Sequence, residues 1–296
     1  SYSQDWAITL PESIRALRGS CVEIPCAFTL PRGNKDFRLV WYNLDSTPDE
    51  IIFSQQDPSD VSEGYRGRTS LVGNEPNSCS LRINDVRESD SYYPYIDWKC
   101  RVYNFARCQS VRVEVSDVPN KPAIQIPTDL TEGERASISC SVEHTCPPRP
   151  PTLQWNRAGY KLTDRQQSLK DGVWKAETVM EYLPSYRDHK AKLECEATYP
   201  NGLKSKSRSA ALNIRYKAQN VTIKGKDEVK EGAALELECH FSDYNPPTTQ
   251  YSYSWYLNGN PVNGETGRIL QINNITESHS GNYSCNVQNG AGPSYS

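Results

Sequence analysis

The segment Ser280-Gly281-Asn282-Tyr283-Ser284-Cys285 places a tyrosine two residues before a cysteine. Strand alternation turns Tyr283 and Cys285 to the same, inward face. Upstream, Cys239 is followed sixteen residues later by Trp255. A cysteine, a tryptophan and a second cysteine in this order are typical of two antiparallel sheets joined by a disulfide on which the indole packs, and the tyrosine hydroxyl can tie the corner of its strand.

The same order of residues occurs twice more along the chain. Cys140 is followed fifteen residues later by Trp155 and is completed by Cys195, and Cys26 is followed fifteen residues later by Trp41. A unit that recurs about every hundred residues predicts tandem domains. We therefore predict an all-β fold of three tandem immunoglobulin-like sandwiches: a V-set domain over 1–118, a C2-type domain over 119–216 and a second domain of C2 or I type over 217–296.

The first unit departs from this order at its second cysteine. The position two residues after Pro94 that would hold the bridging cysteine holds Ile96, and the cysteine available to Cys26 is Cys79. We therefore predict that this bridge leaves the usual strand pair. The three predicted core bridges are Cys26–Cys79, Cys140–Cys195 and Cys239–Cys285.

The composition is that of a β-rich chain without a bulk charge. The 296 residues carry 33 Lys and Arg against 36 Asp and Glu, a formal charge of −3, so nothing draws the whole chain to nucleic acid or anionic lipid. One Met beside 18 Tyr and 20 Pro suits short strands and turns better than long helices. No stretch reaches the roughly 18 to 20 apolar residues of a membrane span, and the first residues lack the features of a signal peptide.

Ten cysteines and three N-x-Ser/Thr sequons, at Asn220, Asn274 and Asn282, indicate the oxidising secretory route, in which disulfides persist and Asn is glycosylated. Asn282 lies on the water-facing side of its strand by alternation, so a glycan there would not disturb the core. The spacings Cys21-x4-Cys26 and His144-x-Cys146 are not the tight, repeated ligand pairs of zinc sites. We expect disulfides, no metal and no cofactor.

Four cysteines lie outside the three core bridges. On the strand that ends at Cys26, alternation turns Cys21 away from its own core, and Cys146 lies in a proline-rich loop that could abut the first domain. We hypothesise an inter-domain bridge Cys21–Cys146, which would hold the two sandwiches at a fixed angle. Cys100 and Cys108 flank the tip of a predicted hairpin and favour a local bridge Cys100–Cys108, although strand parity then requires a bulge near Cys108.

These cysteine placements resemble those of the Siglec family, the sialic-acid-binding immunoglobulin-type lectins. The resemblance covers the whole chain and rests on Gly19-Ser20-Cys21-Val22-Glu23-Ile24-Pro25-Cys26, on the displaced Cys79 and on the extra Cys146, which in the family forms the inter-domain disulfide. The Cys100/Cys108 pair is not part of that pattern.

The resemblance implies a ligand site in the first domain. In the family, one Arg on strand F binds the sialic acid carboxylate, and aromatic residues on strands A and G pack on the ligand. A guanidinium fork suits a carboxylate because it donates paired charge-assisted hydrogen bonds, each worth about 1.5 to 3 kcal/mol. The resemblance places Asp97, of the wrong charge, at the Arg position and Arg107 near the G-strand aromatic, whereas Trp6 retains the A-strand aromatic.

Two interpretations of this departure remain open. In the first, sialic acid binding has been lost or redirected toward a protein or another glycan, because Asp97 would repel a sialate at close range. In the second, Lys99 or Arg101, on the same strand face as Asp97, binds the carboxylate. We favour the first, because a two-residue shift moves the charge by ~6.6 Å along the strand. Tyr95 and Tyr93 share this face, and a solvated strand face without a ligand is the simplest alternative for any one residue.

Three classes of function compete. An enzyme is disfavoured because the four histidines, at 144, 189, 240 and 279, lie in no recognisable nucleophile, metal or phosphate-loop motif. A structural spacer would tolerate changes on one hairpin, whereas a receptor would lose its ligand. We expect the extracellular part of a single-pass plasma-membrane adhesion receptor, truncated at its C-terminal end, with a cell-surface glycoprotein or sialoglycan as ligand and no nucleic acid partner.

Overall fold

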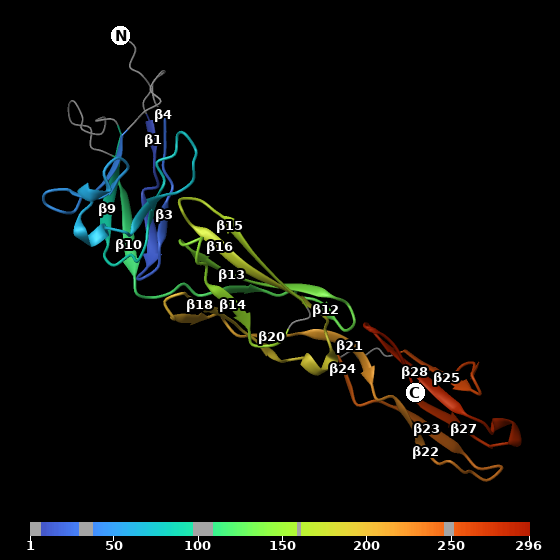
Figure 1. The fold of residues 1–296 in the computed structure, drawn as a ribbon. Helices are drawn as coiled ribbons and strands as arrows, with labels where there is room; N and C mark the ends of the chain where they lie inside the picture. Colours follow the sequence, from blue (N-terminus) through green and yellow to red (C-terminus); the bar gives the residue numbers. More distant parts are fainter. Residues whose placement is uncertain (1–6, 30–37, 97–108, 159–160, 246–251) are drawn as a thin grey trace. The chain divides into compact units, whose positions relative to one another are not determined.

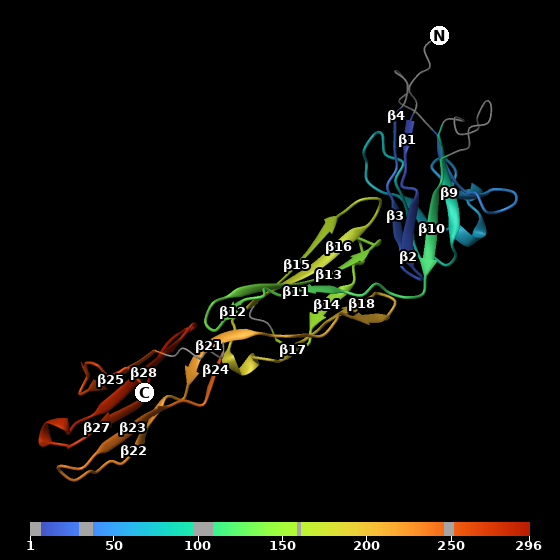
Figure 2. The ribbon, with the colours of Figure 1, turned by 180° about the vertical axis from the view of Figure 1, so that it is seen from behind.

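The computed structural model describes residues 7–29, 38–96, 109–158, 161–245 and 252–296. Within these ranges the regular elements are strands and four short 3-10 helices, and the strands form small antiparallel or mixed sheets (Figures 1 and 2). The prediction of an all-β fold is confirmed. Among the described residues no helix is long and apolar enough to cross a membrane.

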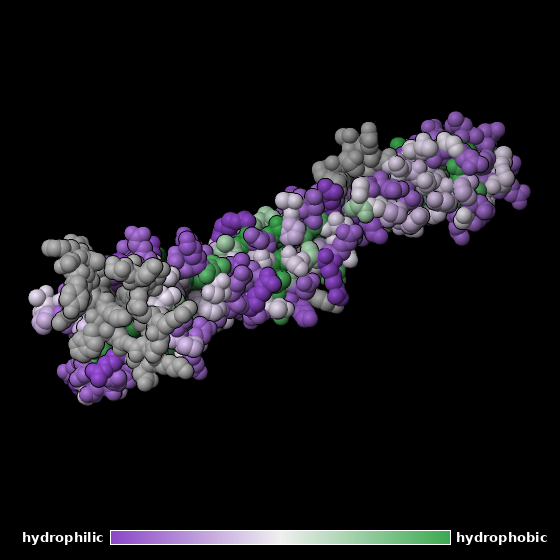
Figure 3. Space-filling model, turned by 90° about the horizontal axis from the view of Figure 1, so that it is seen from above, coloured by the Kyte–Doolittle hydropathy of each residue, from purple (hydrophilic) through white to green (hydrophobic). Residues whose placement is uncertain are grey.

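The chain divides into two compact units. The first comprises Ser1–Gln125, Ser139–Met180 and Glu194–Arg208, and the second comprises Ile126–Ile138, Glu181–Leu193 and Ser209–Ser296. The three domain ranges expected from the sequence stay a prediction. Figure 3 shows a mostly hydrophilic face with only small hydrophobic patches.

The N-terminal sandwich lies within the first unit and is built from three sheets. The largest has the strand order β2 (Ser13–Leu17), β10 (Val111–Ser116), β9 (Asp90–Ile96), β5 (Leu39–Asn43) and β6 (Glu50–Ser54). The opposing sheet has the order β3 (Val22–Ile24), β8 (Leu81–Ile83) and β7 (Thr69–Leu71), and a ribbon pairs β1 (Ala7–Thr9) with β4 (Ala27–Thr29). Strand β2 pairs parallel to β10, and the other pairs are antiparallel.

The core of this sandwich explains its cysteine pattern. Strands β3 and β8 are hydrogen-bonded neighbours, Cys26 follows the first and Cys79 precedes the second, and the Cys79 N–H donates to the Cys26 carbonyl at 2.9 Å. Their disulfide therefore lies within one sheet. The fully buried Trp41 donates from Nε1 to the Cys79 carbonyl at 3.1 Å, so the indole still packs beside the bridge. Ile96, at the position expected for a second cysteine, is fully buried in this core.

The following sandwich contributes strands to both units. One sheet has the order β11 (Ala123–Gln125), β13 (Ala136–His144), β16 (Trp174–Tyr182) and β15 (Lys161–Ser168), and another has the order β14 (Thr152–Trp155), β18 (Cys195–Thr198) and β19 (Lys204–Lys206). Cys140 on β13 and Cys195 on β18 are joined by a disulfide with a Cα–Cα distance of 6.4 Å. Trp155 is buried and pairs with Cys195 across the ladder.

The second unit contains the C-terminal sandwich. Its sheets have the orders β22 (Thr222–Gly225), β23 (Leu235–His240), β27 (Ile269–Ile272), and β26 (Asn260–Pro261), β25 (Ser252–Leu257), β28 (Tyr283–Asn289), β29 (Gly292–Tyr295). The same unit holds a sheet of β12 (Leu130–Thr131), β21 (Ile214–Gln219) and β24 (Asp243–Asn245), and a pair of β17 (Lys192–Leu193) with β20 (Ala210–Ala211).

The tyrosine before the last cysteine ties its strand as the sequence predicted. The Tyr283 hydroxyl donates to the His279 carbonyl at 2.7 Å, and Trp255 is buried next to the Cys239–Cys285 disulfide in one hydrophobic core. Because this hydrogen bond joins β28 to the short 3-10 helix at Glu277–His279, the corner of the sandwich is fixed by a side chain rather than by the backbone alone.

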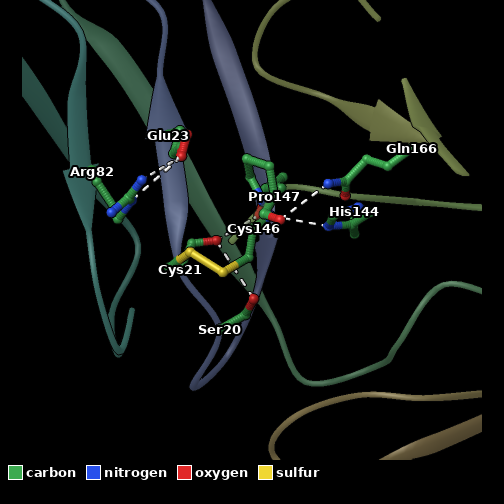
Figure 4. The surroundings of a disulfide bond; sticks show 9 residues. Ser20, Cys21, Glu23, Arg82, His144, Cys146, Pro147 and Gln166 are labelled. Atoms are coloured by element: carbon green, nitrogen blue, oxygen red, sulfur yellow. Dashed lines mark hydrogen bonds and ion pairs between the residues drawn. A yellow bond between two sulfur atoms is a disulfide. The ribbon is translucent and has the colours of Figure 1, made fainter. Parts of the chain in front are cut away.

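A further disulfide, within the first unit, joins two sandwiches. Cys21, just before β3, is bonded to Cys146, just after β13, with a Cα–Cα distance of 4.9 Å (Figure 4). Around the bridge, the Glu23 N–H donates to the Thr145 carbonyl at 3.3 Å, and Thr145 Oγ1 donates to the Cys21 carbonyl at 2.9 Å. The junction is therefore held covalently, by one backbone hydrogen bond and by one hydrogen bond from a side chain. Cys100 and Cys108 lie outside the described residues.

Candidate ligand-binding face

Of the six residues expected at the ligand site, one lies within the described residues. Trp6, Asp97, Lys99, Arg101 and Arg107 lie outside the described residues, and their roles stay predictions. Tyr95 is described: it lies near the end of β9, two residues before Asp97, which the resemblance places at the family's Arg position. The strands around Tyr95 therefore define the part of this face that the structure describes.

Strand register brings four side chains of β5 and β9 together. Val40 is opposite Tyr95 and Tyr42 is opposite Tyr93, and paired residues of a ladder project from the same side of a sheet. On these strands Trp41 and Ile96 belong to the core, so alternation turns the four side chains to the other side of the sheet. They form a separate hydrophobic cluster, which we call the tyrosine cluster.

The rings of the tyrosine cluster pack in specific geometries. Tyr42 stacks on Tyr93 with centroids 5.1 Å apart and an interplanar angle of 14°, and it meets Tyr95 edge to face at 5.9 Å and 88°. Tyr93 is only 9 % and Tyr95 only 8 % exposed. The interpretation of these two tyrosines as part of a solvated strand face is therefore wrong, because cross-strand packing covers both rings. Tyr42 is half-buried and is the more accessible ring of the three.

Charged side chains surround this cluster. The Tyr93 hydroxyl donates to Asp49 Oδ2 at 2.7 Å, which fixes the ring against the loop between β5 and β6. Further along the face, Asp45 accepts from Arg112 on β10 and from the Ser91 N–H, each at 2.8 Å. Arg112 is thus an exposed cation already paired with a carboxylate, and it offers less to an anionic ligand than an unpaired Arg would.

The N-terminal sandwich also has a cavity of about 390 Å³, which is acidic. Its lining includes four carboxylates and two Arg: Asp45, Glu50, Glu88, Asp90, Arg68 and Arg87. Burial raises the pKa of the Asp90 carboxyl above its ordinary value, and the neighbouring carboxylates act in the same direction. Since like charges repel at close range, this cavity disfavours a sialate, and the tyrosine cluster is the better candidate for glycan contact. Among the described residues, no group of His, Cys, Asp and Glu is arranged to hold a metal ion.

Comparison with known proteins identifies the domain types. The model of the immunoglobulin V-set domain matches residues 9–93, and a model described as immunoglobulin domain matches residues 218–296. Human Sialic acid-binding Ig-like lectin 12 (Homo sapiens) is 28 % identical over 313 residues, which cover 97 % of this chain and 51 % of that protein. The B-cell receptor CD22 of Mus musculus is 22 % identical over 99 % of this chain and 37 % of its own length.

The resemblance to the Siglec family is confirmed. Human Myelin-associated glycoprotein is another similar protein, 25 % identical over 97 % of this Siglec-like chain and 46 % of its own length. The chain spans about half the length of the curated relatives it matches, or less. By their printed names these relatives are lectins, receptors and myelin proteins rather than enzymes. Among solved structures, the ectodomain of mouse nectin-like molecule 4 matches 96 % of the Siglec-like chain and 95 % of that chain, with 20 % identity and a TM-score of 0.43.

Sequence reasoning missed Tyr42, Asp49 and Arg112 as parts of the candidate face around the tyrosine cluster. The alternation Val40-Trp41-Tyr42 predicts that Tyr42 lies opposite the core when Trp41 is buried. Predicting that Tyr93 lies opposite Tyr42 across the ladder requires the register between two strands about fifty residues apart. No local sequence pattern supplies that register.

Proposed function

We propose that this chain is the extracellular ligand-recognition part of a cell-surface adhesion receptor, and that it binds a glycoprotein ligand through the β5–β9 face of its V-set domain. The supporting observation is the tyrosine cluster, a set of packed aromatic rings on the sheet side that faces away from the core. Tyrosine is enriched at recognition hot spots because it combines a large apolar ring with a hydroxyl at a small entropic cost.

The residue at the family's Arg position bears on which class of ligand this face binds. Human Sialic acid-binding Ig-like lectin 12 binds sialic acid by its printed name, and the family resemblance places Asp97 of this chain at the position of the carboxylate-binding Arg. We infer that binding depends on the aromatic face and not on a sialate carboxylate. A lectin that uses Lys99 or Arg101 is the second candidate, favoured by the presence of both cations within four residues of Asp97 in the sequence.

The deciding experiment measures binding of the full chain to a sialylated glycan array and to the same array after sialidase treatment. Equal signals on the two arrays are the expected result, since the ligand contact rests on rings rather than on a carboxylate. A signal that disappears with sialic acid would establish the lectin candidate instead. In that case, Lys99→Ala and Arg101→Ala are tested separately, and the variant that loses binding identifies the cation that binds the carboxylate.

A matched pair of variants tests the face itself. Tyr93→Phe keeps the stacked ring and removes only the hydroxyl that donates to Asp49, so ligand binding should change little. Arg112→Ala removes an exposed, already paired cation and should also leave binding within about fivefold, as exposed ion pairs contribute about 0 to 1 kcal/mol. A total loss of binding with Arg112→Ala would place the ligand on β10 and contradict the proposed contact on the tyrosine cluster.

A further inference from the structure

A buried histidine lies beside the disulfide that joins the two sandwiches of the first unit. His144 ends β13 and is 7 % exposed, and its Nδ1 accepts a hydrogen bond from the Cys146 N–H at 3.1 Å (Figure 4). A ring nitrogen that accepts carries no hydrogen, so this geometry corresponds to the neutral imidazole with its proton on Nε2. Within the described residues, Nε2 has no hydrogen-bond partner, so no carboxylate is placed to stabilise a charged ring.

Thr145, the residue between these two, makes two of the hydrogen bonds that cross the junction. Thr145 accepts from the Glu23 N–H through its carbonyl at 3.3 Å and donates through Oγ1 to the Cys21 carbonyl at 2.9 Å. Both partners flank β3 or lie on it. The position of Thr145 is therefore set on one side by the His144–Cys146 hydrogen bond and on the other by the first sandwich.

The charged and titratable groups around the ring do not compensate a positive imidazole. Arg15 of β2, Glu143 of β13 and Tyr199, which follows β18, line a small cavity of about 30 Å³ together with His144. Arg15 donates to Ser116 Oγ at 3.1 Å and is itself a cation, and Glu143 is exposed to water. Across the junction, the Glu23 carboxylate is paired with Arg82 at 2.9 Å.

We propose that the His144–Cys146 segment is an acid-sensitive contact: a proton on His144 Nδ1 removes the acceptor for the Cys146 N–H, and the hydrogen bonds of Thr145 to the first sandwich then loosen. The Cys21–Cys146 disulfide keeps the two sandwiches covalently joined throughout. Acid therefore increases the mobility of the junction without separating the two sandwiches. On the proposed cell-surface protein, the contact is closed at neutral pH and loosens in an acidified vesicle, a consequence that rests on the proposed location.

The sign of the pH dependence follows from the environment of the ring. Burial lowers the pKa of His144 below its ordinary value, and the neighbouring Gln166 side chain opposes this in part. A depressed pKa means that the folded contact favours the neutral ring, so its stabilisation is complete above pH ~6.5 and is lost as the pH falls through the folded pKa. Each pH unit in that window weakens the contact by up to about tenfold.

The test is amide hydrogen exchange of the full chain at about pH 7.4 and about pH 5, corrected for the intrinsic effect of pH on exchange. The readouts are the Cys146 and Glu23 amides. For the wild type we expect their protection to fall in acid, by up to about tenfold for each pH unit in that window. Unchanged protection at both amides would overturn the proposal.

Two variants separate His144 from other titrating groups. His144→Asn keeps an acceptor, since an Asn side-chain oxygen commonly accepts the N–H two residues ahead, and it cannot be charged, so the acid effect should disappear. His240→Asn, at the end of β23, should leave the acid effect as in the wild type. If His144→Asn loses protection in acid as the wild type does, another group is responsible and the proposal fails. Should that variant not fold, an NMR titration of the wild type decides: a His144 ring that titrates at or above pH ~6.5 contradicts the proposal.

Discussion

The substitution Gly172→Ala tests the contact between the tip of a hairpin and β3, and it is expected to lower the stability of the first unit. The hairpin joins β15 to β16, and the Leu169 N–H donates to the Val173 carbonyl at 2.8 Å to close it. Gly172 has φ +80°, and a Cβ at this position would lie 2.8 Å from the Glu23 carbonyl oxygen and 3.0 Å from Ile14 Cδ1. The second sandwich therefore approaches the first so closely here that any side chain displaces backbone.

Two costs add up in Gly172→Ala. Holding an L residue in the left-handed region costs about 1 to 2 kcal/mol, and forcing an extra methyl group into a packed contact costs about 1 to 3 kcal/mol. Gly133→Ala is the matched control, because Gly133 has φ +83° but no atom lies within 4 Å of the place that a Cβ would take. The control carries only the backbone cost, so the difference between the variants isolates the contact at about 1 to 3 kcal/mol.

Calorimetry of the full chain measures this difference. A destabilisation of about 1 kcal/mol lowers the unfolding temperature of a unit of this size by about 2 to 4 °C. The decrease in unfolding temperature should therefore be roughly 2 to 12 °C larger for Gly172→Ala, in the first unit, than for Gly133→Ala. Equal shifts in the two variants would refute the packing of this hairpin against β3, since backbone strain alone would then account for both.

Three further predictions concern single side chains. Tyr283→Phe removes the hydrogen bond to the His279 carbonyl and should destabilise the C-terminal sandwich by about 1 kcal/mol in urea unfolding; an unchanged midpoint would contradict the corner's role. Burial raises the pKa of Tyr199 to about 12, so its stabilisation is complete below pH ~10 and is lost as the pH rises through the folded pKa; a Tyr199 NMR signal that titrates near pH 10 would argue against this. Asn282→Gln should remove one glycan from the secreted protein, seen as a mass shift, with no change in unfolding midpoint, because Asn282 is exposed.

The sequence predicts most of the fold because its signals are covalent or strictly periodic. The Cys…Trp…Cys order alone indicates a sandwich, and the absence of a cysteine at Ile96 indicates that the first bridge is displaced. In the structure Ile96 fills that core position and Cys79 bonds Cys26 within one sheet. Alternation along a strand also places Cys21 outside the core of its sandwich, which suits its bond to Cys146.

The sequence does not predict contacts that depend on register or on the approach of separate elements. The stacking of Tyr42 on Tyr93 needs the pairing of two distant strands, and a one-residue slip would turn one ring into the core. The approach of Gly172 to Glu23 needs the position of one sandwich against another. Neither is encoded in a local pattern, and for that reason β9 considered alone leaves a solvated position of Tyr93 open as an alternative.

The most direct test of the account is the contribution of Tyr42 to ligand binding, measured with the full chain on cells that bear the ligand. Tyr42→Ala should weaken binding by roughly 30-fold, the effect of a hot-spot ring worth about 2 kcal/mol. Tyr256→Ala, at a half-buried tyrosine of β25 in the C-terminal sandwich, should bind as the wild type does, and the unfolding midpoints of both variants establish that they are folded. Wild-type binding by a folded Tyr42→Ala, or equal losses in the two variants, would contradict recognition through the tyrosine cluster.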